Sequence, residues 1–413
     1  MLPERGSLMP FNRVPWALFM LAALVGAACK PDPITNIEVE PFEGDPYPDL
    51  VEDIAYPVGL SALVTDSYSD TVSVLDLVAG TRLDARPVGR NPVDIDGPHH
   101  LALDAPRGFA YVALSYPDLG VAGPHASHGE SGSYGYVQKL RLADLSIIGQ
   151  VRVDPNPGDI LVSADGKRVI TSHFDLKRAI ENASDYDKAK ATIAIVETAN
   201  LELVDSEPAT LVTTCVAPHG MQLAGSTLYV ACYGEDRLAI IDLDAPESGV
   251  ELVDVGSGIS GFGSPVYGPY ALRLSADEST LIVSNTASKD VRFFDTASKE
   301  LDASQTIITQ GAPFFVDLSA DDSKLYIPTQ QPNALLVVDL TGVEETVTRT
   351  FTNAECNLPH AVEELDGNLF VVCEGDHEQP GNVLVLDADL EVLSSIPVGI
   401  YPDSISLIAE PIR

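Results

Sequence analysis

Short runs in which Val, Ile, Leu, Tyr and Thr alternate recur along the chain, bounded by turns rich in Asp, Gly, Ser and Pro. In the clearest copy, an apolar run at residues 228–231 is followed, after a polar turn, by a second run at 238–242 that ends in an acid. A period of two over four to eight residues is typical of β-strands, and helical periodicity is nearly absent. The pattern therefore predicts an all-β protein.

The same pair of runs occurs seven times, and the second and third copies are degenerate. The copies are 63–66 with 72–76, 110–112 with 137–141, 169–171 with 193–197, 228–231 with 238–242, 281–285 with 291–295, 325–327 with 335–339, and 369–372 with 383–387. Repetition of a β-rich unit at this spacing predicts a β-propeller, in which each unit is one four-stranded blade.

A proline opens each repeat. The prolines lie 43 to 61 residues apart, at Pro98, Pro157, Pro218, Pro269, Pro313, Pro359 and Pro402. The last proline begins a strand-like segment with no further strands after it, whereas the first repeat, from about residue 60, has no strong inner strand before it. Pairing the C-terminal strand into the N-terminal blade completes seven blades and removes an exposed sheet edge. We therefore predict a seven-bladed β-propeller over residues 57–413, closed by its C-terminal strand.

Residues 1–28 have the features of an export signal. Arg5 and Arg13 precede an apolar stretch that is too short to span a bilayer comfortably. The stretch ends in Gly-Ala-Ala before Cys29, which resembles the bacterial lipoprotein box. That resemblance implies that Cys29 becomes the lipidated first residue, and Lys30 after it implies sorting to the outer membrane of the cell envelope. Residues 29–56 are acidic and Pro-rich, and we interpret them as a tether.

The charge balance limits the partners of the folded part. The chain has 24 basic and 61 acidic residues. Nucleic acid is excluded as a partner because neutralising phosphates requires Lys and Arg. An anionic bilayer is disfavoured for the same reason, so we expect membrane contact only through the lipid anchor. The acidity itself is typical of a well-solvated exterior.

Four further cysteines form two pairs with the same spacing. Cys215 and Cys232 are 17 residues apart, as are Cys356 and Cys373. In each pair the first cysteine lies three residues before a Pro-His and the second ends an apolar strand. Matching positions in matching repeats favour two disulfides, each worth about 3 kcal/mol, in an oxidising compartment. A metal–thiolate site is the alternative, although the chain has no Cys-x-x-Cys pair.

The histidines indicate where chemistry is concentrated. In a ring of antiparallel blades, all eight histidines fall on the face that also carries the longest insertions. The residues that follow the opening prolines should line the mouth of the central channel; they are His99, Gly158, His219, Tyr270, Phe314, His360 and Asp403. Imidazoles beside a carboxylate suit a divalent ion, for which we considered copper, zinc and calcium. We therefore predict a metal site at His99, His219, His360 and Asp403. The alternative is that each imidazole only caps backbone at the channel rim.

The repeat also resembles a known family. A strand reading Leu-Val-Thr-Asp at 63–66, followed by Val-Ser-Val-Leu-Asp at 72–76, is similar to the repeat of bacterial YVTN-repeat, lactonase-like seven-bladed propellers. The likeness covers about residues 57–413 and implies the fold. It implies no single activity, because that superfamily includes lactonases, redox subunits and surface scaffolds.

From these features we expect a lipid-anchored envelope propeller that acts as a binding module through its His-rich face. Its partner there would be an envelope protein or a small-molecule ligand. One alternative is a metal-dependent, lactonase-like hydrolase in which the ion polarises a carbonyl. A second is a redox partner subunit that docks a cytochrome or a copper protein. No complete catalytic constellation is recognisable in the sequence.

Overall fold

The computed structural model describes residues 47, 52–90, 95–120, 124–204, 206–259, 261–342 and 346–409. The predicted signal peptide (1–28), the predicted lipidation site Cys29 and most of the predicted tether (29–56) lie outside these residues. Within the described part, no helix has the length and apolar character needed to cross a membrane.

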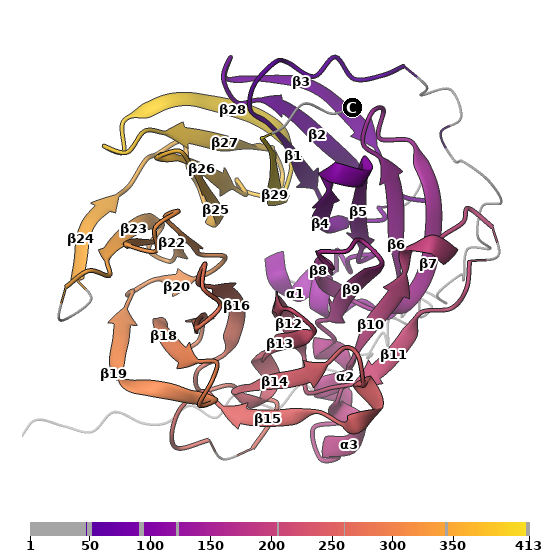
Figure 1. Ribbon diagram of the computed structural model, residues 1–413, viewed down its shortest axis with the longest axis vertical. Coiled ribbons are helices and arrows are strands. Elements are labelled where there is room, and N and C mark those ends of the chain that lie inside the picture. Colours follow the sequence, from indigo (N-terminus) through magenta and orange to yellow (C-terminus); the bar gives the residue numbers. More distant parts are fainter. Residues whose placement is uncertain are drawn as a thin grey trace, which may run out of the picture. The chain divides into compact units, whose positions relative to one another are not determined.

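Seven antiparallel sheets are arranged around a central axis, as Figure 1 shows. The innermost strands are β29 (Pro402–Ile408), β4 (Pro98–Asp104), β8 (Pro157–Val162), β12 (Pro218–Ala224), β16 (Pro269–Leu274), the pair β20 (Ala312–Pro313) and β21 (Asp317–Leu318), and β25 (Pro359–Leu365). The second strands are β1 (Ser61–Asp66), β5 (Phe109–Leu114), β9 (Arg168–His173), β13 (Thr227–Cys232), β17 (Thr280–Asn285), β22 (Lys324–Gln330) and β26 (Asn368–Cys373).

The third strands are β2 (Thr71–Asp76), β6 (Tyr134–Arg141), β10 (Thr192–Glu197), β14 (Arg237–Asp242), β18 (Asp290–Asp295), β23 (Ala334–Asp339) and β27 (Pro380–Leu386). The outer strands are β3 (Thr81–Pro87), β7 (Ile147–Pro155), β11 (Thr210–Thr213), β15 (Glu251–Asp254), β19 (Glu300–Ile308), β24 (Thr346–Phe351) and β28 (Val392–Ile400). The prediction of a seven-bladed β-propeller is confirmed.

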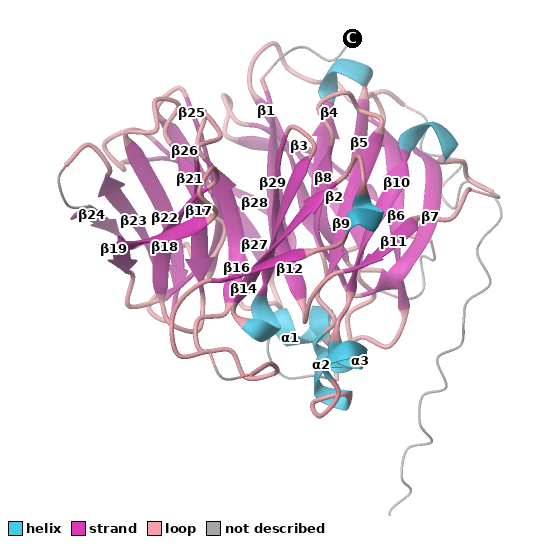
Figure 2. Ribbon diagram, turned by 60° about the horizontal axis from the view of Figure 1, so that its bottom comes forward, coloured by secondary structure: helices cyan, strands magenta, loops and turns pink. Residues whose placement is uncertain are grey.

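Short helices occupy some of the loops. The α-helices are α1 (Pro124–Gly129), α2 (Leu176–Glu181) and α3 (Tyr186–Ala189), and the 3-10 turns are η1 (Ala105–Arg107), η2 (Thr198–Asn200), η3 (Tyr233–Glu235) and η4 (Pro246–Ser248). The three α-helices lie together at one end of the ring, as Figure 2 shows. They belong to the two long insertions after β5 and β9.

The ring closes as the sequence predicts. Strand β29 pairs antiparallel with β1, with Ser61 opposite Ile408 and Val64 opposite Ile405. The closure is reinforced by Asp66, whose carboxylate accepts hydrogen bonds from the Gly399 N–H (2.7 Å) and the Ser73 hydroxyl (2.7 Å). The first and last segments of the propeller thus form one blade.

Strand alternation builds the core between the blades. In β1, Leu63 packs with the blade formed by β4–β7, whereas Ala62 and Val64 pack with the blade formed by β25–β28. Because successive strand residues point to opposite faces, each sheet buries both faces against its two neighbours. This explains why the strands have apolar residues on both faces.

The blade that opens at Pro313 differs from the others. Its innermost strand is broken between β20 and β21. At the break, the Phe315 N–H donates to the His360 carbonyl (3.0 Å), and the Phe315 carbonyl accepts from the Val362 N–H (3.3 Å). Phe315 therefore pairs with the next blade, because these hydrogen bonds replace those lost within its own sheet.

Part of the segment that we interpreted as tether contacts the propeller. Ile54 is buried among core side chains of the first blades, and its N–H donates to the Ala143 carbonyl (2.8 Å). The Tyr56 hydroxyl donates to the Leu142 carbonyl (2.9 Å). The folded unit therefore begins a few residues before position 57.

Both predicted disulfides are confirmed. Cys215 is bonded to Cys232 and Cys356 to Cys373, with Cα–Cα distances of 5.8 Å and 5.0 Å. The metal–thiolate alternative is therefore excluded for these cysteines, including the group formed by Cys215, Cys232 and Glu235.

Asp66 should make the closure sensitive to pH. Burial raises the pKa of Asp66 to about 6, although Ser73, Thr71 and the Gly399 N–H donate hydrogen bonds to it. The folded state therefore binds this proton more tightly than the unfolded chain does. The stabilisation that this proton gives to the folded state is complete below about pH 4 and is lost as the pH rises through about 6. The free energy of unfolding changes by at most ~3 kcal/mol over this range.

We expect Asp66→Asn, which is neutral at every pH, to remove this part of the pH dependence. Urea unfolding at pH 4.5, 6 and 8 measures the change. Asp242→Asn, at an exposed position, controls for the loss of one negative charge. Equal pH profiles for wild type and Asp66→Asn would contradict the assignment.

Candidate metal centre

A recurring backbone feature directs the residue after each proline towards the axis. The residue before the proline is left-handed at six blades, with φ values of 50° at Ala217 and 53° at Leu358. The pairing register then shifts directly after the proline, for example between Pro218 and Met221. Left-handed backbone is strained at Ala and Leu, and bulges of this kind re-aim side chains. The Pro-His pairs of the sequence are thus brought to the inner surface of the ring.

Four imidazoles from three blades meet near the axis. The ring centroid of His99 lies 4.6 Å from that of His100 and 5.9 Å from that of His219. The centroid of His100 lies 5.9 Å from that of His219 and 6.3 Å from that of His360. All four are buried, and His100, at 4% exposure, is the most accessible of them. We call these four residues the axial histidines.

His99 and His219 are each held through Nδ1 by a backbone carbonyl on the innermost strand of the following blade. His99 Nδ1 lies 3.0 Å from the Pro157 carbonyl, and His219 Nδ1 lies 3.2 Å from the Tyr270 carbonyl. A carbonyl can only accept, so Nδ1 carries the proton and Nε2 is the ring's electron-pair donor in the neutral form. This arrangement is typical of histidines that bind metals through Nε2.

His100 has the same arrangement with a carboxylate. Its Nδ1 lies 3.2 Å from Asp159 Oδ1, while Asp159 Oδ2 accepts from the Met221 N–H (2.8 Å). Its Nε2 is buried and has no hydrogen-bond partner among the described residues. Burial lowers the pKa of His100, and the hydrogen bond to Asp159 opposes that shift only in part. His100 is therefore a neutral donor oriented by a carboxylate.

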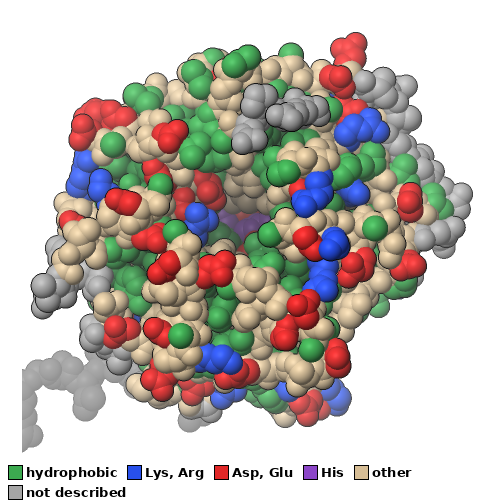
Figure 3. All heavy atoms as spheres, in the orientation of Figure 1, with side chains coloured by type: hydrophobic (Ala, Val, Ile, Leu, Met, Phe, Trp, Pro, Cys, Tyr) green, Lys and Arg blue, Asp and Glu red, His purple; other side chains and the backbone are tan. Residues whose placement is uncertain are grey.

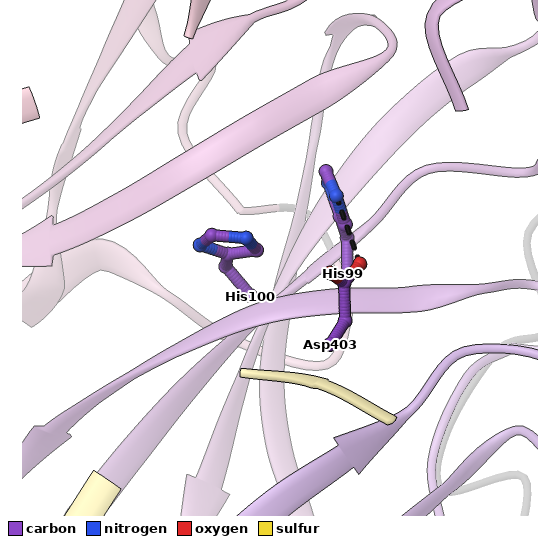
Figure 4. A group of neighbouring side chains, drawn as sticks. All are labelled: His99, His100 and Asp403. Carbon is purple, nitrogen blue, oxygen red and sulfur yellow. Dashed lines mark ion pairs between the residues drawn. The ribbon is translucent and has the colours of Figure 1, made fainter. Parts of the chain in front are cut away.

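Asp403 lies between two imidazoles of different blades. Its Oδ2 is 2.9 Å from His99 Nε2, an ion pair marked in Figure 4, and its Oδ1 is 2.9 Å from His360 Nδ1. Burial alone would raise the pKa of Asp403, but His99 and His360 hold it well below its ordinary value. Asp403 is thus a buried carboxylate that stays ionised.

His99 shows why this cluster needs a cation. Its Nδ1 faces the Pro157 carbonyl and its Nε2 faces the Asp403 carboxylate, so both ring nitrogens face oxygens. In a neutral ring one nitrogen carries a lone pair, which would repel the carboxylate oxygen at 2.9 Å. Either a second proton or a metal ion must lie between Nε2 and Oδ2.

Two groups of side chains have donor atoms close enough to hold an ion. His99, His100 and Asp403 form one group, and His360, Glu374 and Asp403 form the other; within each group the donor atoms lie within 4.8 Å of one another. Burial alone would lower the pKa of His360, but Asp403 and Glu374 outweigh it and raise the pKa to about 9. Asp403 belongs to both groups.

Aromatic side chains enclose the axial histidines. Phe315 lies across the axis, with its ring centroid 4.7 Å from that of His100 and 5.4 Å from that of His360. On the insertion side, His128 of α1 is stacked on His99, with centroids 4.4 Å apart and ring planes 6° apart. Such surroundings exclude water and strengthen electrostatic interactions within the cluster.

Figure 3 views the end of the ring opposite the insertions, and imidazole side chains are visible at the floor of a hollow at the axis. The helices α1–α3 lie at the other end. We had expected an open, His-rich mouth on the insertion face, but there His128 of the insertion is stacked on His99.

The structure brings together most of the predicted site residues. His99, His360 and Asp403 are in direct contact through the Asp403 carboxylate. His219 is adjacent but stacks on Tyr270, with centroids 3.9 Å apart, and belongs to neither donor group. Among the other residues expected at the mouth, Gly158 and Phe314 supply no donor side chain.

Sequence reasoning missed three residues of the site, namely His100, Asp159 and Glu374. His100 directly follows a predicted ligand, and Glu374 directly follows Cys373 at the end of a second strand. Both residues therefore lie at strand ends that the sequence places near the channel or the insertions. What the sequence did not reveal is the register shift after Pro98, which brings His99 and His100, two successive residues of one strand, together near the axis.

Comparisons with known proteins agree with this architecture. No protein-family model and no curated protein sequence matches the chain. Among solved structures, a periplasmic gluconolactonase of Pseudomonas aeruginosa is 16% identical, with a TM-score of 0.60 over 85% of this chain and 100% of that chain. A protein from Lactobacillus plantarum is 14% identical, with a TM-score of 0.60 over 84% of this chain and 99% of that chain.

A proposed 6-phosphogluconolactonase of Bacteroides fragilis is also 14% identical, with a TM-score of 0.57 over 85% of this chain and 98% of that chain. At such identities a structural likeness establishes the fold and leaves the activity open. The chain is therefore a seven-bladed β-propeller with the architecture found in lactonase-like proteins.

Proposed function

We propose that the propeller binds a transition-metal ion at its axis through His99, His100 and Asp403, and that it works as a metal-dependent binding module of the cell envelope. The observation that carries the proposal is the position of His99, whose Nε2 faces a buried carboxylate oxygen at 2.9 Å while its Nδ1 is held by a carbonyl. A metal ion between Nε2 and Oδ2 satisfies both atoms.

The donor set selects the class of ion. Two imidazoles and one carboxylate suit zinc, copper or iron. Calcium, which we also considered from the sequence, prefers six to eight oxygen donors and is disfavoured here. The Asp159 carboxylate behind His100 supplies the outer support that such ligands usually have.

The envelope location remains part of the proposal. It is supported by the two disulfides, which persist in oxidising compartments. It also rests on the export signal and Cys29, which the sequence predicts. A tethered propeller would present its axial hollow to a small molecule or to a partner protein that completes the coordination of the ion.

Metal analysis tests the proposal. We expect the purified full-length protein, stripped of metal and titrated with Zn²⁺ by calorimetry, to bind with submicromolar affinity. His100→Ala should weaken the binding by at least about 100-fold, because it removes a ligand. Loss of a residue that only orients a ligand is expected to weaken metal binding less than this.

His173→Gln is the matched control. His173 is equally buried but lies outside both donor groups, with its Nδ1 held by the Thr192 carbonyl (2.8 Å). Absence of Zn²⁺, Cu²⁺ and Fe²⁺ binding by the wild type would overturn the proposal. In that case His99 would be an imidazolium, which nitrogen-15 NMR of the ring detects directly.

A hydrolase of the lactonase type is a second candidate, favoured by the hollow at the axis with imidazole side chains at its floor. An ion in the centre would polarise a lactone carbonyl and lower the pKa of water. The structural likeness to a gluconolactonase supports the fold for such a function. The wild type should then hydrolyse gluconolactone, lose this activity when stripped of metal and regain it when metal is added. If His100→Ala also lacks the activity, this candidate is favoured over a pure binding module.

A further inference from the structure

We propose that His360, Glu374 and Asp403 hold a second ion, and that Asp403 bridges the two ions through its two carboxylate oxygens. This inference rests on the proposed function, because Asp403 is shared with the first site. It deepens that function from a single-ion site to a paired-ion centre.

The geometry of Asp403 is that of a bridge. Its Oδ2 lies 2.9 Å from His99 Nε2 and its Oδ1 lies 2.9 Å from His360 Nδ1, so each oxygen faces the imidazole of a different donor group. Adjacent ligands of an octahedral ion are separated by about this distance when each lies about 2.1 Å from the metal. Centres with two metals place their ions roughly 3.5–4 Å apart. A single carboxylate can span that distance.

The environment of His360 is rich in oxygen. Its Nδ1 lies 2.8 Å from the Asp403 carbonyl, 2.9 Å from Asp403 Oδ1 and 3.7 Å from Glu374 Oε1. A single N–H group must be shared among these acceptors, whereas an ion that displaces the Nδ1 proton takes several oxygens at once. A donor set of one nitrogen and three oxygens suits harder ions, such as Mn²⁺ or Fe²⁺, than the two nitrogens and one oxygen of the first site do. It also accepts Zn²⁺.

Glu374 is held in place from two sides. Its Oε1 accepts from Gln330 Nε2 (3.0 Å), and its Oε2 lies 2.8 Å from His377 Nε2. The side chain of Glu374 is fully buried, while that of His377 is 14% exposed. These contacts fix the orientation of the Glu374 carboxylate, as hydrogen-bond partners behind a metal ligand usually do.

The charges of the buried groups favour the pair of ions. Asp403 and Glu374 have fully buried side chains, and Asp159 behind His100 is also buried. Buried carboxylates require compensation by positive charge. Two divalent ions supply that charge where the carboxylates converge, and they leave the axial histidines neutral, as metal coordination requires.

The stoichiometry of binding tests the inference. We expect calorimetry of the metal-free, full-length protein with Zn²⁺ to give two ions per chain. In Glu374→Gln the second ion should bind at least about 100-fold more weakly, because a charged ligand is lost, while the affinity for the first ion changes less than about threefold. Glu363→Gln is the matched control: Glu363 is a half-buried carboxylate on the same blade, in β25, and lies outside both donor groups.

Electron paramagnetic resonance with Cu²⁺ tests the bridge without any variant. One equivalent of Cu²⁺ should give the signal of an isolated ion, and a second equivalent should reduce the integrated signal, because two bridged Cu²⁺ ions couple magnetically. Two ions with additive, uncoupled signals would refute the bridge. One ion per chain with unchanged affinity in Glu374→Gln would refute the second site and leave the proposed function standing. Absence of any bound ion would refute both.

Discussion

A chain that ends at Tyr401 is expected to lose the cooperative unfolding transition of the full-length protein. The truncation removes β29, which supplies the innermost strand of the first blade and places Ile405 and Ile408 in two different layers of the core. Burial of two such side chains is worth about 3–6 kcal/mol, before the backbone hydrogen bonds with β1 are counted. That loss is comparable with the whole stability of a typical domain, about 5–15 kcal/mol.

Near-UV circular dichroism and urea titration measure this effect. A chain that ends at Ala409 is the control, because it keeps β29 intact. A synthetic peptide of residues 402–409, added in excess, should restore the transition by pairing with β1. Retention of wild-type stability by the shorter chain would show that the ring does not depend on this strand.

Asp403→Ala is expected to be the most damaging single substitution in the axial cluster. It removes the carboxylate that contacts His99 and His360, and all three side chains are almost fully buried. Breaking a buried charge pair by removing one partner costs about 3–5 kcal/mol, because the remaining charge loses its compensation. The same change removes a ligand from both donor groups, so binding of Zn²⁺ should be lost.

Urea unfolding and Zn²⁺ calorimetry on the same sample separate the two effects. Asp403→Asn keeps the shape of the side chain and should recover part of the stability without recovering metal binding. Ser406→Ala, on the same strand and only weakly hydrogen-bonded (3.4 Å to the Leu101 carbonyl), is the control. Wild-type Zn²⁺ affinity in Asp403→Asn would contradict the role of the carboxylate as a ligand.

Most of the fold was predictable because it depends on local, repeated information. The spacing of the opening prolines and the alternation of apolar residues define the blades, and the unmatched segment from Pro402 identifies the closing strand. The equal spacing of the cysteine pairs predicts both disulfides. The break around Phe315 could not be predicted, because it results from hydrogen bonds with a neighbouring blade 45 residues further along the chain, at His360.

The composition of the axial cluster was predictable only in part. The Pro-His pairs and Asp403 lie at equivalent positions of their repeats, so their convergence follows from the symmetry of the ring. The roles of Asp159 and Glu374 depend on which atom of which side chain faces the axial histidines. That depends on bulges and on packing across blades, which a single sequence does not display.

The closing strand also determines when the centre can form during synthesis. His99 and His100 lie about three hundred residues before Asp403, so the ribosome releases the shared carboxylate long after the two imidazoles. Pairing of segments so distant in sequence is slow. A nascent chain that has not yet reached Pro402 therefore lacks the shared carboxylate, and the proposed ion sites would form only after the ring has closed.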